Sequence, residues 1–171
     1  MEKKKVNTKK ISGIGLMIAL AFVLSYIESM MPINIGIPGI KPGFSNIVVI
    51  FSLYVYSPLT AFGIAIVRII LVGLTFGNFA SLMYSFAGGM LSFVIMYVLR
   101  RLDLFSVNGV SVAGGVSHNI GQIIVALISL LSYISFMYLP ALIISGMIAG
   151  IVVGIAGGLL IKRIGRYMNE M

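Results

Sequence analysis

The chain has 171 residues, of which 60% are hydrophobic and only 9% are charged, whereas a soluble domain is typically about a quarter charged. It contains no cysteine, which excludes disulfides, thiolate nucleophiles and zinc–thiolate sites, and its single histidine and four acidic residues leave little for metal binding or acid–base catalysis. The net charge of +8 does not indicate nucleic-acid binding, because the cations stand at the ends of hydrophobic segments, as membrane topology requires. We therefore expect an all-α, polytopic membrane protein that forms one domain.

The N-terminal part predicts a cytoplasmic anchor followed by a retained first span. Residues 1–10 carry five lysines, which the positive-inside rule places in the cytoplasm. The apolar run over residues 11–30 has about the 20 residues needed to cross hydrocarbon. Small residues recur at four-residue spacing along it and predict one narrow face for helix packing, against this chain or a partner subunit. These residues are Gly15, Ala19, Ala21 and Ser25.

Residues 31–43 cannot form a helix, because three prolines and three glycines interrupt them. The stretch is nevertheless apolar apart from Asn34 and Lys41. Irregular backbone at membrane depth must be shielded by protein or line a wet pocket, so an external lid over a cavity and an ordinary interfacial loop are both open. Glu28 stands just before this loop, either at the headgroup level or facing inward, where Arg68 or Lys41 would be its partner.

The remaining apolar runs predict five further spans, with both termini in the cytoplasm. The second and third are expected to be short, and Pro58 suits the first turn of the third. Basic residues at 100–101 and 162–166 mark the inner ends of the fourth and last spans. The expected spans are residues 44–56, 59–73, 79–99, 111–133 and 141–161, with a cytoplasmic tail at 163–171.

Arg68 is the outstanding residue, because it lies inside the third apolar run. An arginine in hydrocarbon costs roughly 3 kcal/mol on insertion scales, so it must face a partner, a cavity or water. Two interpretations stay open at this point. Arg68 either serves a functional site or holds helices together by pairing with Glu28 or with backbone carbonyls.

Other polar and small residues indicate which helix faces point into the bundle. Ser81, Tyr84 and Ser85 lie toward the outer end of the fourth span, where helix packing or a pocket would explain them. His118, Asn119 and Gln122 are too polar for lipid, and we expect a structural, hydrogen-bonding role for them. A glycine at every fourth residue predicts that the last span packs backbone to backbone against a neighbour. These glycines are Gly146, Gly150, Gly154 and Gly158.

Taken in order, several short motifs resemble one family over residues 12–161. They are Lys41-Pro-Gly-Phe-Ser-Asn46, Arg68 with Gly73 and Gly77, Ser85-Phe-Ala-Gly-Gly-Met-Leu-Ser92, Gly115-Val-Ser-His118-Asn119-Ile-Gly-Gln122, and Leu139-Pro140. Together they resemble the Gx transporter family, which often carries the label heptaprenyl diphosphate synthase component I. That family is similar in size and layout to the substrate-binding S components of energy-coupling factor (ECF) transporters.

The resemblance implies a six-helix protein that binds a small molecule beneath its first external loop. It also implies docking on a transmembrane coupling subunit that paired ATPases drive. Residues 31–46 and the outer ends of the third to sixth helices would line the pocket, and Gly15 and Ala19 would meet the coupling subunit. The chain has Gly-x-x-x-Ala here, where S components usually show Ala-x-x-x-Ala.

The synthase label can be tested against the chemistry that it names. Prenyl chain elongation requires Asp-rich motifs that hold magnesium on the diphosphate, and Asp103 is the single aspartate of this chain. The sequence also has no P-loop with which to hydrolyse ATP. We therefore expect no catalytic residues, metal or cofactor, while an accessory role beside a separate prenyl diphosphate synthase subunit stays open.

The sequence thus favours a substrate-binding subunit in the cell membrane that takes up a small molecule. Arg68 and Lys41 would attract an anionic group, and Tyr84 would offer an apolar wall. The expected hydrogen-bonding residues are Asn46, Asn78, Ser81 and Ser85. The rivals are an accessory subunit of a heptaprenyl or polyprenyl diphosphate synthase, and a purely structural subunit in which Arg68 pairs with Glu28.

Overall fold

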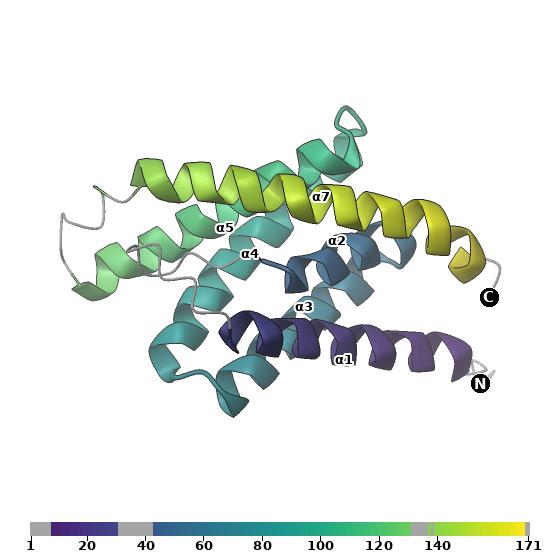
Figure 1. Cartoon of the computed structure of the whole chain (residues 1–171), viewed down its shortest axis with the longest axis horizontal. Coiled ribbons are helices and arrows are strands. Elements are labelled where there is room, and N and C mark those ends of the chain that lie inside the picture. Colours follow the sequence, from purple (N-terminus) through teal and green to yellow (C-terminus); the bar gives the residue numbers. More distant parts are fainter. Residues whose placement is uncertain (1–7, 31–42, 131–136, 138, 170–171) are drawn as a thin grey trace, which may run out of the picture.

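The computed structural model describes residues 8–30, 43–130, 137 and 139–169, and every regular element in these ranges is a helix (Figure 1). The helices are α1 (Thr8–Met30), α2 (Ser45–Val55), α3 (Pro58–Thr75), α4 (Phe79–Leu102), α5 (Val107–Leu130) and α7 (Leu139–Asn169). Five of them are long and apolar enough to cross a membrane. The prediction of an all-α, multi-pass membrane protein is therefore confirmed.

Helix α2 differs from the others in length. Its 11 residues cover roughly 17 Å at about 1.5 Å per residue, whereas the hydrocarbon core is about 30 Å thick. It is packed against α1, α3 and α7, and the side chains of Val48, Ile50 and Leu53 are fully buried. A helix surrounded by other helices needs no polar face, which explains why its sequence is almost entirely apolar.

Several helix ends lie outside the predicted spans. Helix α3 has 18 residues, so the expectation of a short third span was wrong. Helix α5 begins at Val107, inside the predicted inner loop, and α7 continues to Asn169 through the predicted tail at 163–171. Hydropathy marks where a chain crosses hydrocarbon, but backbone hydrogen bonds continue into the headgroup region. Lysine and arginine side chains can reach the interface from such extensions.

Local capping chemistry sets the turns between helices. The Ser57 side chain accepts a hydrogen bond from the Thr60 N–H at 3.2 Å, and Pro58 occupies the first turn of α3, as predicted. Asn78 and Ser81 form a capping box at the start of α4. Helix α4 ends at Leu102, and the C-cap residue Asp103 adopts a left-handed conformation with φ of 53°.

The glycines of α7 allow it to approach the backbone of α5. A Cβ atom at Gly150 would lie 2.6 Å from the Val112 Cα, and one at Gly154 would lie 2.9 Å from the Asn108 Cα. Gly146 faces the Gly115 carbonyl oxygen in the same way. The predicted backbone packing is confirmed for these three glycines. It is wrong for Gly158, where a Cβ would meet only a Val107 methyl group at 3.9 Å.

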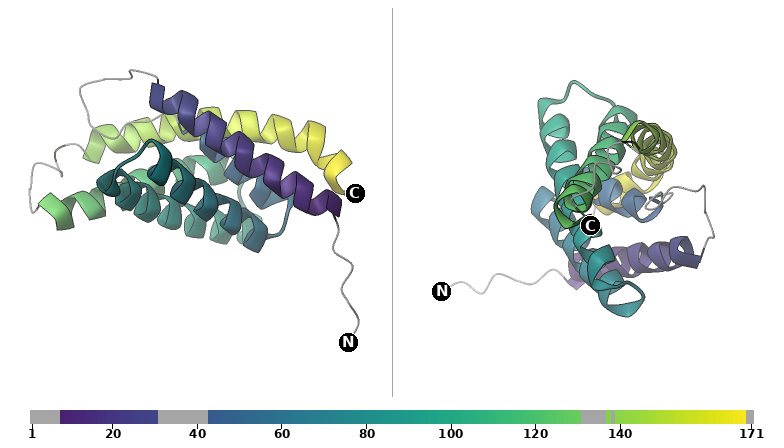
Figure 2. Two further views of the ribbon diagram at one scale, coloured as in Figure 1. Left: turned by 90° about the horizontal axis from the view of Figure 1, so that it is seen from below. Right: turned by 90° about the vertical axis from the view of Figure 1, so that its left-hand side faces the viewer.

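The start of α1 and the end of α7 lie at the same end of the bundle in both views (Figures 1 and 2). Both segments carry basic residues, including Lys9, Lys10, Lys162 and Arg163. The last turn of α1, the first turn of α2 and the start of α4 lie away from this end (Figure 1). The arrangement therefore separates a basic end of the bundle from the region that holds the cavity described next.

Candidate substrate-binding cavity

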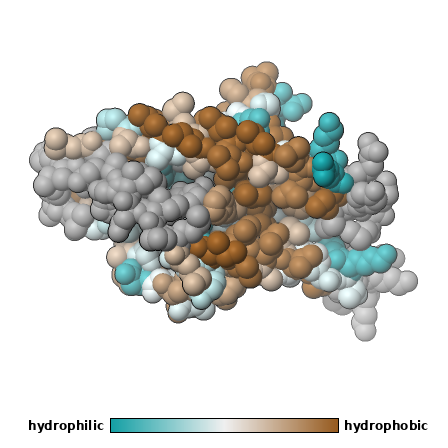
Figure 3. Space-filling view, viewed as in Figure 1, coloured by the Kyte–Doolittle hydropathy of each residue, from teal (hydrophilic) through white to brown (hydrophobic). Residues whose placement is uncertain are grey.

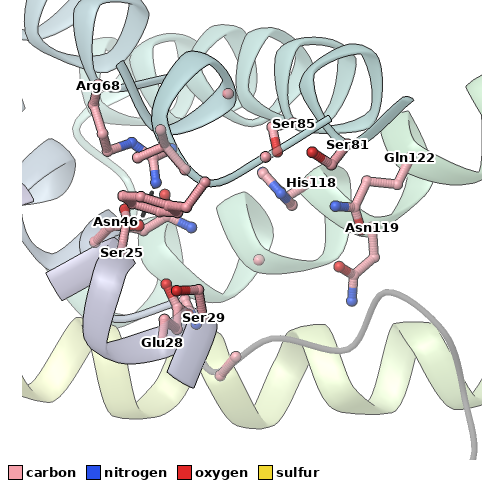
Figure 4. A pocket seen from close by; sticks show the side chains of 18 of the residues that line it. Ser25, Glu28, Ser29, Asn46, Arg68, Ser81, Ser85, His118, Asn119 and Gln122 are labelled. Carbon is pink, nitrogen blue, oxygen red and sulfur yellow. Dashed lines mark hydrogen bonds between the residues drawn. The ribbon is translucent and has the colours of Figure 1, made fainter. Parts of the chain in front are cut away.

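A polar cavity of about 320 Å³ lies between the helices, and Figure 4 shows the side chains that line it. All six described helices contribute to its lining. Its charged side chains are Arg68 and Glu28, and its other polar side chains are Ser25, Ser29, Ser45, Asn46, Asn78, Ser81, Ser85, His118, Asn119 and Gln122. Its volume is at the lower end of the range for small-molecule sites.

Arg68 is held in the wall of this cavity by α3 and is 9% exposed. One terminal nitrogen of its guanidinium donates a hydrogen bond to the Ser45 hydroxyl. Its Nε has no hydrogen-bond partner among the described residues. A buried donor without a partner is costly, so a rearrangement that gave Nε an acceptor would stabilise the site.

Glu28 connects α1 to the beginning of α2. Its Oε1 accepts hydrogen bonds from the N–H groups of Gly43 and of Phe44, the latter at 3.1 Å. A carboxylate at this position also interacts favourably with the positive end of the helix dipole. Glu28 therefore faces inward rather than lying at the headgroup level, and it lines the same cavity as Arg68. Lys41, the other partner that the sequence suggested, lies outside the described residues.

Four of the predicted hydrogen-bonding residues line the cavity, namely Asn46, Asn78, Ser81 and Ser85. Two of them already bond to each other, because the Asn78 side chain accepts from the Ser81 N–H at 2.8 Å and the Ser81 hydroxyl accepts from the Asn78 N–H at 2.9 Å. Tyr84 is on α4 but is not among the lining residues. The cavity thus places the predicted amides and hydroxyls near Arg68 without the expected tyrosine wall.

Two serines in the cavity wall were not anticipated from the sequence, Ser25 and Ser29, whereas Ser45 belongs to residues 31–46, which the family resemblance placed at the pocket. Ser25 and Ser29 flank Glu28 at spacings of three and one, which places all three on adjoining positions of α1. The Ser25 hydroxyl is buried and has no hydrogen-bond partner among the described residues. The sequence signal that could have indicated them was the group of three polar residues, Ser25, Glu28 and Ser29, at the end of an otherwise apolar span.

His118, Asn119 and Gln122 also line the cavity, from α5. The Asn119 amide nitrogen donates to the Leu142 carbonyl oxygen at 2.6 Å and to the Ser145 hydroxyl at 3.2 Å. Asn119 therefore ties α5 to α7 while one side of it faces the cavity. Beside it, α4 comes so close to α5 that a Cβ at Gly88 would lie 2.7 Å from the His118 carbonyl oxygen.

The small residues of α1 lie on two faces and not on the single face that their spacing suggested. Ala21 and Ser25 are buried against the bundle, whereas Gly15 and Ala19 are exposed. A Cβ at Gly15 would meet nothing within 4 Å. Successive helical residues turn by about 100°, so pairs offset by six positions point in different directions. Gly15 and Ala19 are thus free for a contact outside the described part of this chain.

The described residues contain no group of three His, Asp or Glu side chains that could hold a metal ion. What the cavity offers instead is one buried cation, one carboxylate bound to a helix start, and several hydrogen-bonding groups. This arrangement can bind a small polar molecule.

A family model described as heptaprenyl diphosphate synthase component I matches residues 17–160. The chain belongs to this family. The family identified from the sequence motifs is thereby confirmed, and the matched region of the chain contains every residue that lines the cavity. Neither the curated proteins nor the solved structures contain a match to this chain.

Proposed function

We propose that this protein is the membrane-embedded substrate-binding subunit of an importer for a small molecule with an anionic group. Separate partner subunits would supply the energy, as in the S components of ECF transporters. The protein itself would be non-catalytic and would lie in the cell membrane with both termini in the cytoplasm. The observation that carries the proposal is the buried Arg68, which lines a cavity of about 320 Å³. No described residue accepts a hydrogen bond from its Nε.

The geometry favours a carboxylate or phosphate as the group that Arg68 binds. Ser45 accepts a hydrogen bond from one terminal nitrogen of the guanidinium, while the buried Nε has no acceptor among the described residues and would gain one if the group turned toward a bound ligand. A planar guanidinium recognises such oxyanions through paired N–H donors, and charge-assisted hydrogen bonds are roughly twice as strong as neutral ones. The amides and hydroxyls of α4 and α5 would bind the remainder of the ligand.

The test is native mass spectrometry of protein extracted gently from its own membranes, with identification of any released small molecule. We expect the wild type to carry one stoichiometric, non-lipid ligand with an acidic group. Arg68→Ala should remove this ligand while leaving a monodisperse protein. Arg100→Ala is the matched control, because Arg100 lies 5.0 Å above the Tyr54 ring and does not line the cavity.

Retention of the ligand by a well-folded Arg68→Ala protein would overturn the proposal. A wild-type protein that arrives without a ligand but bound to a soluble prenyl diphosphate synthase would favour the second candidate function. That candidate, a non-catalytic accessory subunit of a heptaprenyl or polyprenyl synthase, is supported by the description of the family. It predicts no saturable small-molecule site at Arg68.

A further inference from the structure

A second cavity, of about 530 Å³, opens on the apolar side of the bundle between α1 and α7. Its floor is α2, against which both of these helices pack. It is lined by Met17, Leu20, Leu24, Ile47, Val48, Phe51, Ala156, Leu159, Leu160, Arg163 and Ile164. We refer to this cavity as the α1–α7 groove. Arg163 is the one charged residue in its lining.

The groove exists because α2 holds α1 and α7 apart. Gly157 brings α7 close to α2, since a Cβ there would lie 2.6 Å from a methyl group of Ile50. Leu20 and Leu159 are exposed on the two flanking helices. Figure 3 shows the strongly hydrophobic surface on this face of the molecule. An empty apolar gap forfeits dispersion contacts, so in a bilayer it will be filled with hydrocarbon.

The position of the groove matches one leaflet of the membrane. Its lining on α7 extends from Ala156 to Ile164, about 12 Å at 1.5 Å per residue, whereas half of the hydrocarbon core is about 15 Å. Arg163 stands at the end of this stretch, toward the basic end of the bundle. With the basic end of the bundle at the cytoplasmic surface, as proposed above, the groove would extend from near the middle of the membrane to a cation at its inner surface.

We propose that the α1–α7 groove binds one membrane phospholipid with an anionic headgroup. One acyl chain lies over α2 between the two helices, and Arg163 binds the phosphate. Basic pockets between transmembrane helices on the cytoplasmic side are typical sites for anionic headgroups. Lys162, Lys9 and Lys10 are exposed at the same end and add to the positive potential there. This site is separate from the polar cavity, and its existence does not depend on the proposed transport function.

The experiment uses the full-length protein reconstituted in bilayers of equal parts phosphatidylglycerol and phosphatidylcholine. Native mass spectrometry then counts the lipids that remain bound to the protein after the protein is released from the bilayer. We expect the wild type to retain one phosphatidylglycerol in preference to phosphatidylcholine. Arg163→Ala should lower the retained phosphatidylglycerol at least fivefold. Lys162→Ala, its matched control, removes a neighbouring cation that does not line the groove and should change retention less than twofold.

A second variant tests the chain-binding part of the groove. Ala156→Phe would place a ring in the groove and should abolish retention of both lipids in a monodisperse protein. Unchanged retention in either Arg163→Ala or Ala156→Phe would overturn the proposal, as would equal losses in Arg163→Ala and Lys162→Ala. In a further arm, farnesyl diphosphate is added at the concentration of phosphatidylglycerol. If farnesyl diphosphate replaces the bound phospholipid, the phospholipid assignment is overturned and the groove is a prenyl diphosphate site. If phosphatidylglycerol stays bound, the proposal is supported.

Discussion

The polar cavity has two walls that are assembled by different means. On one side, α4, α5 and α7 meet through glycines, so that backbone lies against backbone. On the other side, α1, α2 and α3 are connected at the cavity by side-chain hydrogen bonds, from Glu28 to the start of α2 and from Arg68 to Ser45. The first wall also contains the Asn119 hydrogen bonds between α5 and α7, but its shortest contacts involve backbone, which cannot move aside as a side chain can. The second wall is held by side-chain hydrogen bonds that can exchange partners. We therefore expect adaptation to a ligand on the side of α1, α2 and α3.

The largest effect is expected from a side chain added within the glycine wall. A Cβ at Gly115 would lie 3.2 Å from the Gly146 carbonyl carbon and closer still to its oxygen, so Gly115→Val must separate α5 from α7. We expect a loss of more than about 3 kcal/mol or failure to fold, because backbone cannot yield as a rotamer can. Thermal unfolding in detergent measures this loss of stability. Gly15→Val is the control, since nothing lies within 4 Å of that site, and equal losses in both would contradict the comparison.

A smaller effect is expected from the hydrogen-bonded wall. Glu28→Ala leaves two backbone N–H groups at the start of α2 without their acceptor, which should cost about 2–3 kcal/mol. Glu28→Gln keeps an acceptor but loses the charge, and should cost about half as much. The same unfolding measurement applies.

The double exchange Glu28→Arg with Arg68→Glu separates two explanations for these charges. An arginine cannot accept hydrogen bonds, so the exchange should leave α2 destabilised. If the exchanged protein instead regains wild-type stability, an ion pair between the two side chains is what holds this wall together. The purely structural interpretation of Arg68 would then be favoured.

A third, moderate effect distinguishes capping from ligand binding at Asn78. Asn78→Ala removes the cap of α4 and should cost about 1 kcal/mol, whereas Asn78→Ser retains a capping oxygen and should remain close to wild type. If Asn78 also binds the ligand, the serine variant will show weaker ligand retention at unchanged stability. Native mass spectrometry beside thermal unfolding measures both quantities, and unchanged retention would limit Asn78 to its capping role.

The smallest effect has the opposite sign. A methyl group added at Gly63 in α3 would meet nothing within 4 Å, so Gly63→Ala should stabilise the protein by about 0.5–1 kcal/mol through helix propensity and reduced entropy of the unfolded chain. Comparison of unfolding midpoints in detergent tests this. A destabilised Gly63→Ala protein would indicate that a neighbour packs on α3 at this position.

Sequence patterns predicted the features that depend on local chemistry or on strict periodicity. Hydropathy identified the helical membrane fold, the four-residue glycine repeat indicated backbone packing, and the Ser57-Pro58 pair marked the start of α3. The cost of a buried charge singled out Arg68, which the structure places in a cavity wall.

What the sequence did not predict depends on three-dimensional neighbours. Nothing in α2 alone indicates that Ser45 accepts a hydrogen bond from Arg68, 23 residues away. The close approach between α5 and α7 ends at Gly154 because α5 begins at Val107, the residue that faces Gly158, and the glycine repeat does not encode where the neighbouring helix begins. Likewise, the assignment of Gly15 and Ala21 to different faces requires the position of α2 beside α1.

The shortness of α2 governs how much room the protein has for a guest. Gly43, just before this helix, and Ser45 and Asn46 in its first turn form part of the cavity wall, so the cavity begins where this helix begins. Each additional turn at that end would advance the helix by about 5.4 Å into the space now available. The length of this buried helix thus sets the size of the cavity. Members of this family with a longer second helix should accommodate smaller molecules, and members with a shorter one should accommodate larger molecules.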